Sequence, residues 1–281
     1  MILNILLIAS CIQIITESLP ISSSGHVLLT FLYGAPELAF SETLHALVHL
    51  PTLFIIAVLF RADWWPLLCH FIKTTYKKLK GKLIKPHDDT TWNLCLKITG
   101  MVITSNLITL VMQQLGKAYK KSNATSPYLL LVGFIITMIL LFSLRLKPKY
   151  KRYKNLNFMI ACIIGVVQGC ALIPGISRFA STFVIGVWLG LSPRRSLHYT
   201  VFLATTIIIG EFGRCLLSLK PLTNQELVML TTPVNALYLL LASFIGYKTF
   251  AIARTAALKN NFWIFGFYMI APISAVAWYL R

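Results

Sequence analysis

An acidic side chain within an apolar stretch marks the first segment of this sequence that could do chemistry. Glu17 follows Gln13 by four residues, so both side chains lie on one face of a helix. Pro20 ends that helix, and three hydroxyl side chains follow it, which are Ser22, Ser23 and Ser24. Serine in this place caps a following helix, whose N-terminus attracts anions. A carboxylate, an amide and hydroxyls therefore gather at one predicted break.

The same break ends in Gly25 and His26. Glycine lets the backbone approach a ligand closely, and histidine acts as a nucleophile or a proton carrier. A purely structural alternative is a capped helical hairpin around a hydrogen-bonded core histidine. An ionisable group such as Glu17 is costly inside an apolar zone, so the cluster as a whole favours a functional site.

A second break follows much later in the chain, at Pro174-Gly175-Ile176-Ser177-Arg178. Pro174 and Gly175 predict a turn, and Ser177 can cap the helix after it. Arg178 offers a planar fork of donors that suits phosphate oxygens, although it could also reach lipid headgroups or pair with Glu17. If the two breaks meet, the combined side chains suit phosphoryl chemistry or phosphate binding.

Other polar residues in apolar segments are interpreted either as structural or as lining the mouth of the site. Glu211 and Arg214 are three residues apart, which predicts mutual neutralisation on one helix. Glu42 and His45 begin an apolar run and could line the mouth of the site. His49 is interpreted as a packing residue.

The elements that carry these residues are those of a membrane protein. The chain has 281 residues, of which 57% are hydrophobic and 12% are charged, against about 45–50% and about 25% in soluble domains. Runs long enough to cross a bilayer occur six times, at 43–60, 93–115, 127–146, 197–219, 234–253 and 262–280.

Two further apolar regions, 1–39 and 157–191, contain the two breaks. Their flanking runs are short for a full span, which predicts helical hairpins that enter the membrane and turn back. The sequence therefore predicts an all-α integral membrane protein with six transmembrane helices and two re-entrant helical hairpins. We expect a single membrane domain over 1–281, in which 157–281 repeats 1–146 in inverted orientation.

The net charge of +18 follows from topology rather than from a nucleic-acid partner. The loops expected at 61–92, 145–157, 192–196 and 254–261 hold 17 of the 26 basic residues. The opposite side holds five, which are Lys117, Lys120, Lys121, Lys220 and Arg281. Basic loops stay in the cytoplasm, and the run Lys73 to Lys85 is expected to lie on anionic lipid headgroups.

At both breaks the sequence resembles the bacterial undecaprenyl-diphosphate phosphatases, also called bacitracin-resistance proteins. The first motif is similar to (Glu/Gln)-x-x-x-Glu followed by Pro-x-Ser-Ser-x-Gly-His, which Gln13, Glu17, Pro20, Ser22, Ser23, Gly25 and His26 fit. The second is similar to Pro-Gly-x-Ser-Arg-Ser-x-x-Thr, which Pro174, Gly175, Ser177, Arg178 and Thr182 fit. The spacing of segments resembles the family along nearly the full length.

This resemblance implies a hydrolase that removes the terminal phosphate of a C55 polyprenyl diphosphate and so recycles the lipid carrier for cell-wall synthesis. It implies catalytic roles for Glu17, Ser23, His26 and Arg178, with either Ser23 or His26 as the nucleophile. Substrate would be bound by Gln13, Ser22, Ser24, Gly25, Gly175, Ser177 and Thr182. A divalent metal, Mg²⁺ or Ca²⁺, would be held at Glu17. The site would face the periplasm from the bacterial inner membrane, and a homodimer is compatible with the resemblance.

The sequence also departs from the family pattern. Phe179 stands where the motif has Ser, Ala180 replaces a common Gly, and Pro51 stands where Gly is expected in a His-x-Gly-Thr-like stretch. Two alternatives to a hydrolase follow. Broken helices in inverted repeats also suit a polyprenyl-phosphate flippase or transporter, and Phe179 is the main argument for a non-catalytic protein that binds carrier lipid.

Overall fold

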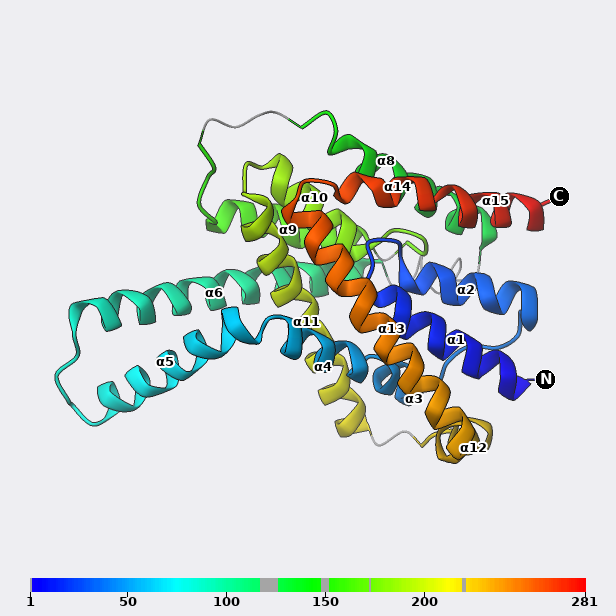
Figure 1. Ribbon diagram of the computed structural model, residues 1–281, viewed down its shortest axis with the longest axis horizontal. Helices are drawn as coiled ribbons and strands as arrows, with labels where there is room; N and C mark the ends of the chain where they lie inside the picture. The colour runs from blue at the N-terminus through cyan, green and yellow to red at the C-terminus, as the bar shows by residue number, and fades with distance from the viewer. Residues whose placement is uncertain (1, 117–125, 148–151, 172, 219–220) are drawn as a thin grey trace.

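Helices form all the regular structure in the part of the chain that the computed structural model describes, residues 2–116, 126–147, 152–171, 173–218 and 221–281. Figure 1 shows their arrangement, with both termini on the same side of the view. The predicted all-α class is confirmed at this level. Lys117, Lys120, Lys121 and Lys220 of the charge count lie outside the described residues.

Five helical segments among the described residues are long and apolar enough to cross a membrane. They are Glu42–Leu59 (α3, Glu42–Val48, and α4, Leu50–Leu59), α6 (Pro86–Leu115), α11 (Pro193–Ser218), α13 (Pro233–Leu258) and Phe262–Tyr279 (η1, Phe262–Ile264, α14, Phe265–Tyr268, and α15, Ile270–Tyr279). The expected span at 127–146 is a shorter apolar helix, α8 (Pro127–Ser143). Exposed apolar side chains on α6 and α13 suit contact with lipid, among them Leu107, Leu110, Leu237 and Leu240.

Both predicted breaks separate two short helices. The first lies between α1 (Ile2–Glu17) and α2 (Ser23–Gly34), and the second lies between α9 (Phe158–Cys170) and α10 (Arg178–Trp188). At 1.5 Å per residue, helices of this length reach about 16–24 Å, which is less than the hydrocarbon thickness of about 30 Å. The helix–break–helix pattern that the sequence predicts is therefore present at both places.

The two hairpins pack crosswise against the other half of the chain. Helix α1 lies along α13, and α9 lies along α6 (Figure 1). Glycine allows each close approach: a Cβ on Gly246 of α13 would lie 3.1 Å from the carbonyl oxygen of Ile14, and one on Gly165 of α9 would lie 2.7 Å from that of Ser105. Each break is thereby fixed by residues distant in sequence.

The connections predicted as loops are largely helical, which corrects those boundaries. Residues 61–92 contain α5 (Arg61–Leu79) and the start of α6, α11 begins at Pro193, and α13 continues to Leu258. Together α5 and the first part of α6 form an arm that extends from the rest of the molecule (Figure 1). The loops were predicted between the apolar runs, where basic residues gather. The same segments also carry apolar side chains at helical spacing, and this pattern, which a count of charges does not include, favours helices. The basic side chains of α5, including Lys73, therefore lie on a helix.

A short helix and an aromatic core complete the fold. Helix α12 (Asn224–Thr231) begins with a capping box in which Thr223 and Glu226 exchange hydrogen bonds. The largest core cluster includes the fully buried rings of Phe134, Phe183 and Phe262, which come from α8, α10 and η1. This cluster holds α10, and with it the second break, against the last helical segment.

Candidate functional site

The carboxylate of Glu17 is the centre of a polar cluster inside the helical bundle. Its Oε2 accepts a hydrogen bond of 2.7 Å from Gln13 Nε2 and a short one from Ser23 Oγ. Its Oε1 lies 3.6 Å from His49 Nδ1 and 4.0 Å from Arg178 Nη2. The Glu17 side chain is only 13% exposed, so these neighbours replace most of its solvent.

The first break places Ser23 against Glu17 through an unusual backbone conformation. Ser22 caps α2 in the left-handed region with φ of 68°, and its Oγ accepts from the Gly25 backbone N–H. A non-glycine residue in this region is strained, and such residues cluster at functional sites. Ser24, also predicted to bind substrate, is exposed at the start of α2.

The second break is fixed by hydrogen bonds from α8. Thr137 donates its hydroxyl to the carbonyl of Gly175, which has φ of +91°, and accepts from the backbone N–H of Ser177. Ser177 caps α10 as predicted, accepting from Ala180 N–H, and Thr182 donates its hydroxyl to the Arg178 carbonyl. Arg178 is thus the first residue of α10, and its side chain remains 33% exposed.

The two breaks touch each other. A Cβ on Gly25 would lie 3.0 Å from Gly175 Cα, and one on Gly133 of α8 would lie 2.1 Å from the Pro174 carbonyl oxygen. No larger residue fits at Gly25 or Gly133 without movement of the breaks. The two motifs, about 150 residues apart in the chain, therefore share one place in the fold.

His26 belongs to a different part of this region. Its Nδ1 lies 2.8 Å from the Ser22 carbonyl oxygen, which can only accept, so Nδ1 carries the proton. Its Nε2 lies 3.1 Å from the hydroxyl of Tyr268, with which the ring also stacks. Among the described residues the polar contacts of the His26 ring therefore go to Ser22 and Tyr268, whereas Ser23 and Arg178 meet Glu17.

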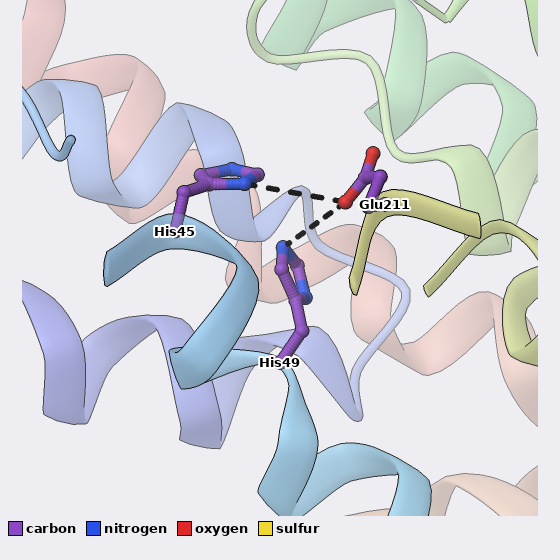
Figure 2. A group of neighbouring side chains, drawn as sticks. All are labelled: His45, His49 and Glu211. Carbon is purple, nitrogen blue, oxygen red and sulfur yellow. Dashed lines mark ion pairs between the residues drawn. The ribbon is translucent and has the colours of Figure 1, made fainter. Parts of the chain in front are cut away.

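Three further residues join the cluster: His49 and Glu211, which received structural interpretations, and His45, which was expected to line the mouth of the site. His45 Nδ1 and His49 Nε2 each lie 4.0 Å from Glu211 Oε2, and Figure 2 shows both rings directed at that carboxylate. Glu211 thus faces two imidazoles, while Arg214 is exposed. The spacing of four between His45 and His49, and an acid within an apolar span, were the signals that could have indicated this group.

A small pocket opens beside Glu17 and Arg178, with a volume of about 40 Å³. Its polar lining consists of Glu17, Thr52, Gln168, Arg178, Thr182 and Thr200. Its apolar lining consists of Ile56, Phe179, Val201, Ala204, Ile207, Ile208 and Phe250. A polar floor under an apolar wall suits a ligand with a charged head and a hydrocarbon tail.

Phe179, the main departure from the family motif, is a packing residue as well as a pocket residue. Its ring lies 5.8 Å from that of Phe250 and 5.9 Å from that of Phe262, measured between centroids. The side chain therefore joins α10 to α13 and η1 and leaves the Arg178 guanidinium free to face Glu17.

The oxygen atoms around Glu17 are compatible with Mg²⁺ or Ca²⁺. Such ions take oxygen ligands, and Mg²⁺ is held by one or two carboxylates together with substrate phosphates and water. Glu17 supplies a carboxylate, and Ser23 supplies a hydroxyl oxygen that is hydrogen-bonded to it. A phosphate-bearing substrate would have to provide part of the coordination.

Comparison with known proteins finds similarity to one family along most of the chain. A family model described as bacitracin resistance protein BacA matches residues 6–274. A curated protein of Borrelia recurrentis, named undecaprenyl-diphosphatase, is 28% identical over 96% of this chain and 96% of its own length. One of Clostridioides difficile, named undecaprenyl-diphosphatase 1, is 30% identical over 94% of this chain and 90% of its own. One of Rhodopirellula baltica, again named undecaprenyl-diphosphatase, is 33% identical over 72% and 70%.

Proposed function

The chain belongs to the bacitracin resistance protein BacA family, and from this premise we propose that it is a membrane phosphatase that hydrolyses undecaprenyl diphosphate. The products are undecaprenyl phosphate and inorganic phosphate, so the reaction returns a lipid carrier to cell-wall synthesis. The observation that carries the proposal is the meeting of Glu17, Ser23 and Arg178 beside one pocket. The names of the curated relatives favour hydrolysis over the flippase alternative.

The geometry favours Ser23 over His26 as the nucleophile. The Ser23 hydroxyl already donates to Glu17, whereas both ring nitrogens of His26 have other partners. In the proposed reaction, Ser23 Oγ attacks the terminal phosphorus as its proton passes to Glu17, and the bond to the bridging oxygen breaks. Glu17 then gives this proton to the leaving undecaprenyl phosphate and is ionised again. Water then attacks the phosphoserine as Glu17 takes a proton from it, and the bond between phosphorus and Ser23 Oγ breaks. Glu17 passes that proton to Ser23 Oγ, which restores the hydroxyl, and phosphate leaves.

Arg178 is the proposed ligand of the diphosphate. Its guanidinium can stabilise the charge that develops on phosphoryl oxygens, and the positive ends of the helix dipoles of α2 and α10 favour an anion at the two breaks. Gln13 orients Glu17, and the apolar wall of the pocket accommodates the start of the prenyl chain. A bound Mg²⁺ or Ca²⁺ at Glu17 would supply charge neutralisation to the diphosphate.

The finer architecture is also part of the proposal. We propose six transmembrane helices, with α8 as the sixth, and two re-entrant hairpins in an inverted repeat of 1–146 and 157–281. The crosswise packing of α1 on α13 and of α9 on α6 supports this, since equivalent helices of an inverted repeat exchange partners. The excess of basic residues on one side supports a site open to the periplasm from the inner membrane.

Phosphate release from C55 diphosphate by purified protein in proteoliposomes tests the proposal. Removing a donor that stabilises transition-state charge costs about 10²–10³ in rate, so Arg178→Ala should lose about that much. Ser23→Ala should lose more activity than His26→Ala. Arg214 is an exposed arginine of α11, and Arg214→Ala is the matched control. Its rate of phosphate release should stay within about twofold of the wild-type rate, which is small compared with the loss expected for Arg178→Ala.

A folded wild-type protein that releases no phosphate with any divalent cation would refute the proposal. A non-hydrolysable diphosphonate lipid in the same proteoliposomes tests the transporter alternative. A transporter should move this lipid between the two leaflets, whereas a phosphatase need not.

A further inference from the structure

His45, His49 and Glu211 form a group whose donor atoms converge without a hydrogen bond among them. Both imidazoles point at the same carboxylate oxygen, Glu211 Oε2, each from 4.0 Å (Figure 2). The three ligand atoms lie within 4.8 Å of one another. The residues come from two helical segments that pack together, α3 with the start of α4, and α11.

Two buried atoms of this group have no hydrogen-bond partner within the described part of the chain. They are Glu211 Oε2 and His49 Nδ1. A buried polar atom without a partner costs about 1–3 kcal/mol. Glu211 Oε2, at which both imidazoles point, therefore indicates a missing ligand or ion, whereas His49 Nδ1 faces Glu17. The His49 side chain is only 1% exposed, which leaves its nitrogens little access to solvent.

The donor set identifies the kind of ligand. Two imidazole nitrogens and one carboxylate oxygen are the ligands of catalytic zinc sites, which keep a fourth position for water or substrate. Imidazole also suits other first-row transition metals, whereas Mg²⁺ and Ca²⁺ prefer oxygen. We propose that His45, His49 and Glu211 bind one divalent transition-metal ion of the Zn²⁺ type.

Only a modest movement is needed to close this site. Bonds of about 2.0–2.1 Å in a tetrahedron place ligand atoms about 3.4 Å apart, so the donors must approach by about 0.6–1.4 Å. His45 is 44% exposed and can move by rotation of its side chain. His49 Nε2 also lies 3.4 Å from Gln13 Nε2, a long contact that the ion would replace.

His49 connects the proposed ion to Glu17. When Nε2 binds the metal, the proton lies on Nδ1, which faces Glu17 Oε1 at 3.6 Å. A metal-bound histidine commonly donates its second N–H to a carboxylate, and that partner typically contributes 10–100-fold in metal affinity. Glu17 is therefore a positioning residue for the metal site.

Metal binding measured without substrate tests the inference. Protein without a polyhistidine tag is stripped with a chelator, and Zn²⁺ binding is measured by calorimetry and by bound metal per chain, with Co²⁺ as a spectroscopic probe. Wild type should bind one equivalent. His45→Ala and Glu211→Gln should each lose at least about 100-fold in affinity, and Glu17→Gln about 10–100-fold.

The matched control is His198→Ala. His198 Nε2 also faces a carboxylate, that of Asp63 at 3.8 Å, but outside the His45–His49–Glu211 group. This variant should bind Zn²⁺ with wild-type affinity. Unfolding curves in chelator show whether each variant is folded, and Glu211→Gln keeps the shape of the side chain it replaces.

Wild type that binds no stoichiometric Zn²⁺, or His45→Ala and Glu211→Gln variants that bind it as wild type does, would overturn the inference. Because these measurements use no lipid substrate, they stand apart from the phosphatase proposal. Zn²⁺ binding without phosphate release would refute the phosphatase proposal alone. Phosphate release without Zn²⁺ binding would refute the metal site alone.

Discussion

Replacement of Gly133 by alanine should separate the two halves of the proposed site without touching a reacting residue. A Cβ at this position would lie 2.1 Å from the Pro174 carbonyl oxygen and 2.9 Å from backbone atoms of Gly175. Non-bonded heavy atoms need about 3.5 Å. The second break must therefore withdraw by about 1.4 Å, since both crowded groups are backbone.

This displacement should lower activity by about 100-fold. The second break leads directly into Arg178, so its withdrawal moves the guanidinium relative to Glu17, which lies 4.0 Å away. A misplacement of about 1 Å costs about 10² in rate. Overpacking should also reduce the free energy of unfolding by about 1–3 kcal/mol.

The assay is phosphate release from C55 diphosphate, together with a thermal unfolding curve for each variant. Gly210→Ala is the control, because a Cβ there meets no heavy atom within 4 Å. It should keep wild-type activity. A folded Gly133→Ala protein with kcat/KM within about twofold of wild type would refute the reasoning, because the breaks would then tolerate a shift that should cost about 10².

Two further predictions concern stability. Burial raises the pKa of Asp63, but the hydrogen bond from Arg194 and the nearby positive charges lower it by more, so its pKa is below the ordinary value. Asp63→Asn should therefore lower the free energy of unfolding by about 1 kcal/mol at pH 7. In unfolding curves this difference from wild type should shrink as the pH falls below about 4, because the carboxyl of Asp63 becomes protonated. An undiminished difference at pH 3 would contradict this prediction. Phe179→Ala should lower the free energy of unfolding by about 2–4 kcal/mol, because the ring contacts Phe250 and Phe262. Denaturant titration measures this loss, and an unchanged midpoint would show that the ring does not pack.

The sequence was sufficient for features that depend on local chemistry. Charge depletion and long apolar runs predicted a helical membrane protein, and Pro20 and Pro174 located both breaks. Ser177 was predicted to cap a helix and does so. A pairing of Arg178 with Glu17 was one of the alternatives for that arginine, and the two side chains lie 4.0 Å apart.

Contacts between residues that are far apart in the sequence could not be predicted from local patterns. Glu211 was assigned to its neighbour Arg214, yet it faces His45, which is distant in sequence and comes close only when α11 packs on α3. His49 was interpreted as packing because a lone histidine in an apolar run usually is. Pro51 ends α3 beside it and begins α4, so the ring sits at a helix junction within reach of Glu17.

The crosswise packing of the hairpins has a consequence for the order of events during synthesis. Helix α1 is made well before α13, which is its main partner after α2 and begins only at Pro233. At about 5–20 residues per second, translation of the intervening chain takes about 10–40 s. During that time Gln13 and Glu17 have no partners from the second half of the chain. Helix α1 therefore completes its packing late, and the surroundings of the site are complete only after α13 has been made.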